Sequence, residues 1–364
     1  MKKLKFVPVW FFAVFLVLSG CVGSEAGKAS GTGSLTIMTW NIHNLFDGKD
    51  DGGEYVEFRQ SAGWSTEKYL GRINDISAAI SQIEPRPDIV LFQEIESLKI
   101  LEDLALAMPQ GYLWAHFANN PGSPVGLGIL SRFPLIEVQA HSININGDTI
   151  PRPVLETRVQ TKEADFVIFS CHWKSKIGGV EATEKTRMAA ARVVVRRIRE
   201  LLENEIQTGI IVAGDLNLNH DEFYRRDSSV ICSLLPDAPY AAQLAGAQQK
   251  DFIVISGNMP PEPVYFPQGT IVLYSPWMGD MDVGLSENGS YFFRNNWETI
   301  DHFLISRQFF DNFGWEYERT IVADFEPFTN SRGTPNSYNP RTGQGLSDHL
   351  PLLMTLKTGI LINE

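Results

Sequence analysis

Short runs of apolar and β-branched residues recur along the chain from residue 35 onward, and several of them end in asparagine, glutamate, histidine or aspartate. Runs of this length and composition are typical of buried strands. The pattern predicts strands over residues 35–40, 89–92, 127–130, 166–170, 210–213, 300–305 and 350–356. Polar residues that directly follow buried strands are natural positions for a functional site.

Two stretches between these runs have the three- and four-residue spacing of amphipathic helices. Residues 69–83 form the first, and prolines at 85 and 87 end it before the next strand. Its expected inward face consists of Leu70, Ile73, Ile76, Ala79, Ile80 and Ile83. Residues 183–202 form the second helix, with several arginines on its outer face. Because Pro, Gly and aromatic residues are frequent over 236–293, we predict long loops and short strands there.

The first residues have the pattern of a signal peptide. Lysines precede an apolar run over residues 6–18, which is too short and too early for a membrane-spanning helix. The Leu-Ser-Gly-Cys sequence that ends at Cys21 resembles the lipobox of bacterial lipoproteins. This resemblance implies cleavage before Cys21, acylation of its thiol, and a location in the bacterial cell envelope, facing the periplasm or the exterior. An ordinary secretory signal with a coincidental cysteine is the alternative.

The predicted organisation is a signal peptide over 1–20, a flexible tether over 21–34 and one folded domain over 35–358. The tether is rich in Gly, Ser and Ala and has no periodic apolar pattern. No internal repeat or second linker follows it, and no later stretch is apolar enough to cross a membrane. We expect a monomer.

The composition permits a sizeable core, since 43% of the 364 residues are apolar. The formal charge is −12, and loss of Lys2, Lys3 and Lys5 with the signal peptide would bring it to −15. Such a surface does not attract polyanions over long range. A nucleic-acid partner would therefore have to be held by a local basic patch or by metal ions. The three cysteines are too few for a disulfide framework in a chain of this length.

Six short segments, most of them at predicted strand ends, contain residues suited to a phosphate and a divalent metal. These segments are residues 39–42, 92–95, 170–176, 214–217, 300–304 and 347–351. Taken together and in this order, they resemble the endonuclease/exonuclease/phosphatase superfamily, whose founding member is pancreatic deoxyribonuclease. The resemblance covers nearly all of residues 35–356 and implies that the folded domain is a metal-dependent phosphodiesterase.

The resemblance also implies an α/β fold of four layers, an α/β/β/α sandwich in which two packed mixed β-sheets are flanked by helices. By the same resemblance, the catalytic residues are His172, Asp215, Asn217, Asp301 and His349. The implied metal ligands are Asn41, Glu94 and Asp348. Carboxylate and amide oxygens are the hard ligands that suit Mg²⁺. We expect Mg²⁺, with Mn²⁺ or Ca²⁺ as alternative ions.

The chemistry of these residue types is consistent with such roles. Asp215 and Asn217 lie two apart after a buried strand, so an extended backbone would turn both side chains to one face, where they could bracket a phosphate. An Asx turn after the strand fits the same sequence. His349 can donate a hydrogen bond or accept a proton in the working pH range. The resemblance places Asp301 beside His349, where it would orient the imidazole.

His172 is a second histidine at a strand end, and the loop that follows it is both aromatic and basic. The expected substrate-binding residues are Arg152, Lys174 and Lys176. Lys185 and Arg187 could extend this basic patch, with an ordinary solvated helix face as the alternative for these two.

Two departures from family patterns narrow the function. His43 stands where abasic-site nucleases have an acid near the metal, which leaves a second metal site unsupported. No arginine follows Trp297 as it does in inositol polyphosphate phosphatases. We expect a nuclease that acts on nucleic acid or a related phosphodiester. A sphingomyelinase-like enzyme, the main alternative, would need an exposed apolar hairpin over 274–281, and a phosphatase or a non-catalytic binding lipoprotein are weaker alternatives.

Overall fold

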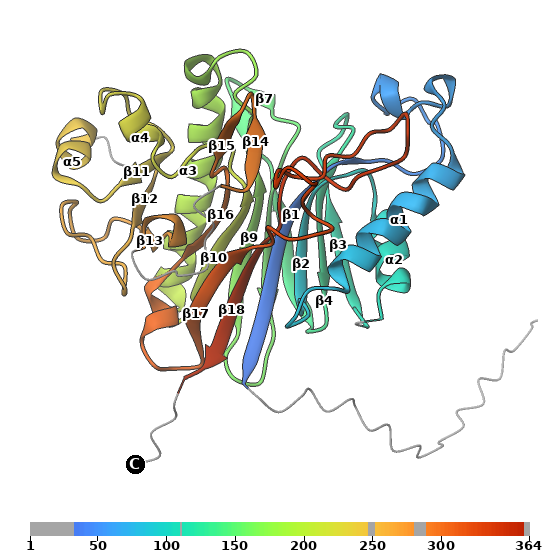
Figure 1. Cartoon of the computed structure of the whole chain (residues 1–364). Helices are drawn as coiled ribbons and strands as arrows, with labels where there is room; N and C mark the ends of the chain where they lie inside the picture. The colour runs from blue at the N-terminus through green and yellow to red at the C-terminus, as the bar shows by residue number, and fades with distance from the viewer. Residues whose placement is uncertain (1–32, 110, 247–251, 280–288, 360–364) are drawn as a thin grey trace, which may run out of the picture. The chain divides into compact units, whose positions relative to one another are not determined.

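The computed structural model describes residues 33–109, 111–246, 252–279 and 289–359 (Figure 1). Cys21, the predicted signal peptide and nearly all of the predicted tether lie outside these residues. The described strands form two large sheets and two small hairpins. No helix among the described residues combines the length and the apolar character needed to cross a bilayer.

The first large sheet has six strands in the order β17-β18-β1-β2-β4-β3. Its strands are β1 (Ser34–Leu45), β2 (Ile89–Ile95), β3 (Trp114–Ala118), β4 (Gly126–Ser131), β17 (Trp315–Val322) and β18 (Leu352–Thr358). The sheet is mixed, because β1 is parallel to β2 and antiparallel to β18.

The second large sheet has eight strands in the order β11-β12-β13-β16-β10-β9-β8-β5. Its strands are β5 (Leu135–His141), β8 (Val154–Val159), β9 (Phe166–His172), β10 (Gly209–Asp215), β11 (Leu234–Pro236), β12 (Ile253–Ser256), β13 (Val272–Tyr274) and β16 (Asp301–Ile305). It is also mixed, because β10 is parallel to β9 and antiparallel to β16. The two hairpins are β6 (Asn144–Ile145) with β7 (Asp148–Thr149), and β14 (Tyr291–Phe293) with β15 (Asn296–Glu298).

Helices flank the two sheets (Figure 1). On the side of the first sheet lie α1 (Thr66–Ile80) and α2 (Leu98–Ala107), and on the side of the second lies the long α3 (Val180–Asn204). The shorter helices are α4 (Glu222–Arg225) and α5 (Pro239–Ala245), with 3₁₀ turns η1 (Val56–Phe58), η2 (Gln60–Ala62), η3 (Pro276–Met278) and η4 (Arg307–Phe310).

The two-residue period of the strands separates two cores in the second sheet. In β10, Ile211 and Ala213 belong to the core shared with the first sheet, whereas Ile210 and Val212 pack in the core that includes α3. The molecule therefore has helix, sheet, sheet and helix layers, and the predicted α/β/β/α sandwich is confirmed.

All seven predicted strands are present, with shifts of a few residues at their ends. The first predicted helix begins at Thr66, earlier than expected, because the side chain of Ser65 accepts a hydrogen bond from Lys68 N at 3.3 Å and caps it. Leu70 is not on the buried face as predicted, since 49% of it is exposed. Over 236–293 the predicted short strands are present, and α5 is an unpredicted helix.

Candidate active site

The site begins with three acidic or imidazole side chains aligned across neighbouring strands of the second sheet. Asp215, the last residue of β10, pairs in register with His172 at the end of β9 and with Asp301 at the start of β16. Each lies an even number of residues from strand positions that face the first sheet, such as Ile168, Ala213 and Phe303. Regular pairing and the two-residue period therefore bring the three side chains to the same face.

Gly214 in β10 allows the backbones of β10 and β9 to approach closely. Its φ is +128°, a conformation that side chains rarely adopt. A Cβ atom at this position would lie 2.0 Å from the carbonyl oxygen of Cys171 in β9. Only glycine fits here, one residue before Asp215.

His349 is held by Asp301. Its Nδ1 atom lies 2.8 Å from Asp301 Oδ2, which also accepts a hydrogen bond from Ser290 Oγ at 2.6 Å. The ring of Tyr291 lies against the imidazole with the centroids 4.5 Å apart. His349 is 6% exposed and Asp301 1%, so this pair is shielded from water. The contact is the one needed for the predicted orientation of the imidazole.

The two histidines are in opposite electrostatic situations. Burial favours a neutral imidazole at His349, but the carboxylates of Asp301, Asp348 and Asp215 outweigh it and raise its pKa to about 10. For His172, burial together with the positive charges of Arg152 and His349 moves the pKa well below its usual value. Near neutral pH, His349 is therefore a cationic donor and His172 is neutral.

Asp215 has a third kind of environment. Burial, followed by repulsion from Asp301, raises its pKa to about 7. Its Oδ2 atom accepts a hydrogen bond from Asn41 Nδ2 at 3.0 Å and lies 3.5 Å from His172 Nε2. A carboxylate that titrates near neutrality is suited to accept a proton from water.

The first sheet contributes Asn41 from β1 and Glu94 from β2. The register of β2 against β4 shifts between Gln93 and Ile95, so Glu94 lies in a bulge, with φ +65°. Bulges re-aim side chains next to many active sites. Glu94 Oε2 accepts a hydrogen bond from Asn44 N at 3.0 Å, and Oε1 lies 3.6 Å from His172 Nε2. The bulge thus turns a carboxylate toward the residues of the second sheet.

These residues line a common cavity of about 590 Å³. All three predicted metal ligands line it, and so do all predicted catalytic residues except Asp301, which lies behind His349. Glu94, Asp348 and the amide of Asn41 offer hard oxygen atoms of the kind that Mg²⁺ prefers. The repulsion among carboxylates that raises the pKa of Asp215 would be relieved by a bound cation. The residues that line the cavity therefore fit a divalent metal.

The expected extended backbone at Asn217 is wrong. Asn217 has φ +51°, and its N–H donates a hydrogen bond to Asp215 Oδ1 at 2.8 Å, which is the Asx turn that the sequence also allowed. The Asn217 amide donates to Trp173 O at 3.1 Å. Both side chains still line the cavity, because the turn keeps Asn217 at the strand end.

The predicted basic residues lie in different environments. Arg152 lines the cavity and donates a hydrogen bond to Trp173 O at 2.7 Å. Lys174 does not line it. Arg187 is wrong as a patch residue, because it is fully buried and paired with Glu184. Lys185 is exposed on α3.

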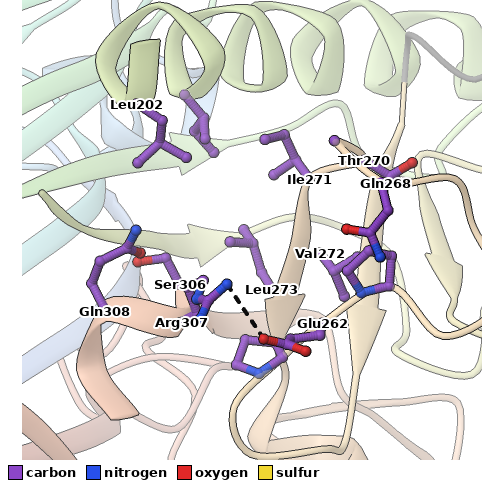
Figure 2. A pocket seen from close by; sticks show the side chains of 14 residues that line it. Leu202, Glu262, Gln268, Thr270, Ile271, Val272, Leu273, Ser306, Arg307 and Gln308 are labelled. Atoms are coloured by element: carbon purple, nitrogen blue, oxygen red, sulfur yellow. Dashed lines mark ion pairs between the residues drawn. The ribbon is translucent and has the colours of Figure 1, made fainter. Parts of the chain in front are cut away.

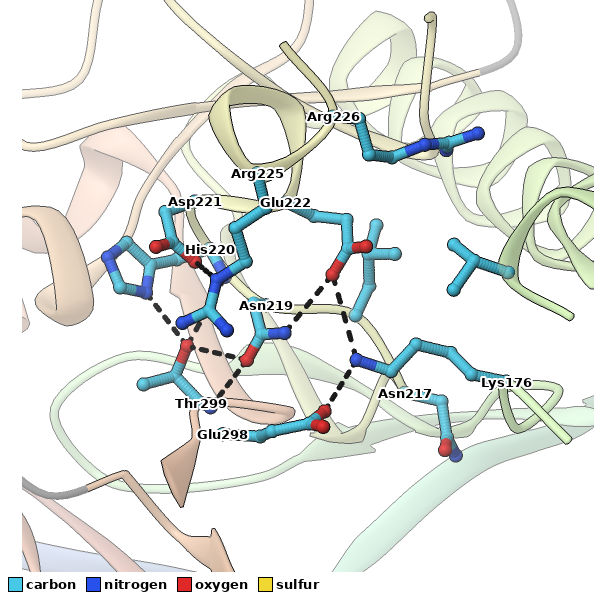
Figure 3. Close-up of polar contacts among 12 residues, drawn as sticks. Lys176, Asn217, Asn219, His220, Asp221, Glu222, Arg225, Arg226, Glu298 and Thr299 are labelled. Atoms are coloured by element: carbon cyan, nitrogen blue, oxygen red, sulfur yellow. Dashed lines mark hydrogen bonds and ion pairs between the residues drawn. The ribbon is translucent and has the colours of Figure 1, made fainter. Parts of the chain in front are cut away.

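Lys176 lines the cavity, but two carboxylates hold its ammonium group (Figure 3). Nζ lies 2.5 Å from Glu298 and 3.6 Å from Glu222. Asn219 joins the same network, since its Nδ2 donates to Glu222 and its Oδ1 accepts from Thr299 N at 2.8 Å. The network ties together the loops after β9 and β10 and the segment before β16.

Sequence reasoning missed the hairpin of β14 and β15. Tyr291, Phe293 and Arg294 of this hairpin line the cavity. The rings of Tyr291 and Phe293 are stacked, with centroids 6.1 Å apart and planes 15° apart. The alternating aromatic residues shortly before Asp301 were the available signal, but the low regularity of this region hid it.

A second cavity, of about 210 Å³, lies between α3, β13 and η4 (Figure 2). Its polar feature is an ion pair between Arg307 and Glu262 at 3.3 Å, and both side chains are more than half exposed. No group of metal-ligating side chains is found among its described lining residues. The predicted catalytic and metal-binding residues therefore have no counterpart among the described residues of this smaller cavity.

Comparison with solved structures shows the same fold at low identity. A truncated Caenorhabditis elegans TDP2 is 14% identical, with a TM-score of 0.53 over 89% of this chain and 98% of that one. A D. rerio TDP2 humanized by 14 mutations is 16% identical, with a TM-score of 0.53 over 90% of this chain and all of that one. D. rerio TDP2 complexed with single strand DNA product is also 16% identical, with a TM-score of 0.51 over 89% and 99% of the two chains.

No curated protein matches the sequence. Residues 36–230, more than half of the chain, match the Endonuclease/Exonuclease/phosphatase family. This segment contains Asn41, Glu94, His172, Asp215 and Asn217. The chain therefore belongs to the endonuclease/exonuclease/phosphatase family, whose members hydrolyse phosphoesters with the help of a divalent metal.

Proposed function

We propose that this protein is an extracytoplasmic phosphodiesterase that acts on nucleic acid, anchored to the membrane by a lipid on Cys21. The observation that carries the enzymatic part is the arrangement of the cavity, in which the buried carboxylate of Asp215 and His349, held by Asp301, lie together with oxygen ligands for a metal. Burial raises the pKa of Asp215, and the carboxylate of Asp301 raises that of His349. Pairs of groups whose environments drive their protonation states apart are typical of acid–base catalysis.

In the proposed reaction, a divalent ion held by Asn41, Glu94 and Asp348 would neutralise negative charge on the phosphate. Asp215 accepts a proton from the attacking water as the water oxygen bonds to phosphorus. The ester bond from phosphorus to the leaving oxygen breaks, and that oxygen takes up a proton from solvent. His349, kept protonated and oriented by Asp301, donates a hydrogen bond to the phosphoryl oxygen on which charge develops.

The charge of the cavity favours a phosphodiester over a polyphosphate. Lys176 is neutralised by Glu222 and Glu298, which leaves Arg152 and Arg294 as the unneutralised basic residues among the described lining residues. A diester has a single negative charge on each phosphate, whereas polyphosphorylated ligands require larger clusters of cations.

The aromatic lining favours nucleic acid over lipid. The ring of Tyr291 lies against His349, and Phe293, which stacks on Tyr291 and is 47% exposed, offers an aromatic surface of the kind that stacks on nucleobases. Trp277, which a sphingomyelinase-like enzyme would expose to a bilayer, instead packs partly buried on the core and donates a hydrogen bond to Asp301 O at 2.8 Å. The end of the predicted apolar hairpin at 280–281 lies outside the described residues.

The location rests on the sequence. The basic, apolar and small-residue regions before Cys21 are in the order of a lipoprotein signal. An enzyme held outside the cytoplasm would act on environmental or periplasmic substrates. Incorporation of labelled palmitate into the wild type, and its loss in Cys21→Ser, tests the anchor.

A hydrolysis panel tests the activity. Single-stranded DNA, duplex DNA, RNA, sphingomyelin and a phosphomonoester are offered with Mg²⁺, Mn²⁺ or EDTA to the wild type and to His349→Ala. We expect metal-dependent cleavage of nucleic acid, reduced in the variant by about three orders of magnitude or more. Preferential cleavage of sphingomyelin or of the monoester would replace the nuclease assignment, and cleavage that survives EDTA would contradict the mechanism.

A further inference from the structure

Arg72 is a charged side chain buried next to two segments that line the active site. It extends from α1, is 1% exposed, and has no carboxylate ion-pair partner within the described part of the chain. Its guanidinium lies 3.8 Å from the centroid of the Tyr338 ring. Burying a charge without a counter-ion costs on the order of several kcal/mol unless hydrogen bonds compensate for the lost hydration. Core packing alone therefore does not explain why an arginine is buried at this position.

Backbone carbonyl groups instead accept hydrogen bonds from the two terminal nitrogen atoms of the guanidinium, whereas Nε has no partner among the described residues. Nη1 donates to Asn44 O at 2.7 Å, and Nη2 donates to the carbonyl oxygens of Ile42 and His43. Nη2 also reaches Leu346 O at 3.4 Å, so Arg72 joins two segments that are far apart in the sequence. The planar fork of arginine makes several hydrogen bonds at once, which the single ammonium of lysine cannot reproduce in the same geometry.

The segment held on one side is strained and adjoins two predicted metal ligands. His43 and Asn44 have φ values of +54° and +59°. A left-handed residue other than glycine costs about 1–2 kcal/mol in general, and less when it is asparagine. In this conformation His43 N donates to Asn41 Oδ1 and Asn44 N donates to Glu94 Oε2, both at 3.0 Å. The carbonyl groups that Arg72 holds thus belong to the turn whose N–H groups hold Asn41 and Glu94.

The segment held on the other side leads to the third predicted ligand. Leu346 directly precedes Ser347, whose hydroxyl donates to Asn41 O at 2.6 Å and accepts from His349 N at 3.1 Å. Asp348 lies between these residues and lines the cavity. The guanidinium charge also attracts the carboxylates of Glu94 and Asp348.

From these contacts we infer that Arg72 is a positioning residue of the metal site. It sets the separation between the turn that orients Asn41 and Glu94 and the segment that presents Asp348, without touching the ion or the substrate. This role rests on the proposed function in so far as the cavity holds a divalent metal. Through Arg72, helix α1 of the outer layer would thus align Asn41 and Glu94 with Asp348, which lies far from them in the sequence.

The test is Mn²⁺ binding to the full-length protein by isothermal titration calorimetry. Arg72→Lys keeps the charge but loses the fork, and we expect its Mn²⁺ affinity to fall by about tenfold or more, as for other residues that orient metal ligands. Arg158→Lys is the matched control. Arg158 is also a buried arginine, but its guanidinium forms ion pairs with carboxylates. It lies in β8 opposite the start of β9, at the other end of that strand from His172.

The melting temperature without metal is measured for each variant, so that loss of fold is separated from loss of alignment. If Arg72→Lys does not fold, Tyr338→Leu removes the ring beside the guanidinium and should weaken Mn²⁺ binding by about threefold, on the scale of one cation–π contact. Mn²⁺ affinity that is unchanged in the folded variants would overturn the inference, and so would a wild type that binds no Mn²⁺. A wild type that binds Mn²⁺ but cleaves no phosphodiester would contradict only the proposed function.

Discussion

The two large sheets bring their residues to the cavity by different means. In the second sheet, regular strand pairing aligns His172, Asp215 and Asp301 at one register. At the end of the first sheet the backbone is irregular, because Glu94 lies in a bulge and the turn after Asn41 has two left-handed residues. One half of the site is thus aligned by the sheet itself, and the other by contacts specific to this turn.

The difference separates two functions within the cavity. Ladder hydrogen bonds fix the second-sheet residues without backbone strain at Asp301, His172 or Asp215. In the proposed reaction these residues are the acid and base machinery. The first-sheet residues are the proposed oxygen ligands, and they are oriented by a turn with left-handed residues that Arg72 contacts. Changes in the first half should therefore act on metal binding, and changes in the second half on the chemical step.

The sharpest way to break this comparison is to remove one carboxylate from each half. Asp301→Asn leaves His349 without its counter-ion, so kcat should fall by about 10³-fold or more while the metal requirement stays the same. Glu94→Gln should instead raise the Mg²⁺ concentration needed for half-maximal rate by about 10–100-fold. Metal titrations of the rate for both variants are the measurement. Equal shifts in metal requirement would show that the two halves are not separate.

A smaller effect concerns stability in the second half. The pKa of Asp215 is raised to about 7 in the folded protein, above its value in the unfolded chain, so the folded protein holds a proton that the unfolded chain has released. The folded protein therefore loses stability as the pH rises from about 4 to about 7. Asp215→Asn removes that loss and should melt several degrees higher than the wild type at about pH 8 in EDTA, with the gap closing by about pH 4. Thermal denaturation across this range is the measurement, and a variant less stable than the wild type at pH 8 would contradict it.

The smallest effect is expected at the network that borders the second half. Lys176→Met removes a partly exposed ion pair, which is worth about 1 kcal/mol or less, and frees Glu222 and Glu298 to repel the substrate. We expect KM to rise by about threefold with little change in kcat, because the network orients loops without contacting the reacting atoms. Steady-state kinetics measure this. Arg307→Met, which removes the exposed pair with Glu262 at the smaller cavity, is the control and should leave KM unchanged.

Much of the second half could be predicted from the sequence. Apolar runs over 166–170 and 210–213 predict strands just before His172 and Asp215, and the resemblance to the family implies the two sheets. The roles assigned to these residues stay predictions, although the contact between Asp301 and His349 is the one that those roles require.

The first-sheet half of the site was harder to predict from the sequence. No periodicity indicates a bulge at Glu94 or left-handed backbone at His43, since both depend on tertiary contacts with residues distant in the sequence. Lys176 was predicted to bind substrate, but its acidic partners lie 46 and 122 positions away, and no local pattern connects them. Arg72 resembled an ordinary polar residue of an amphipathic helix.

Gly214 sets a limit on how this enzyme can change. Because a side chain there would collide with the backbone of β9, every functional variant must keep glycine next to Asp215. The exposed residues 293–296 at the cavity hairpin meet no such restriction. Directed evolution toward a new substrate should therefore accumulate its changes in the hairpin, with position 214 unchanged in every active clone.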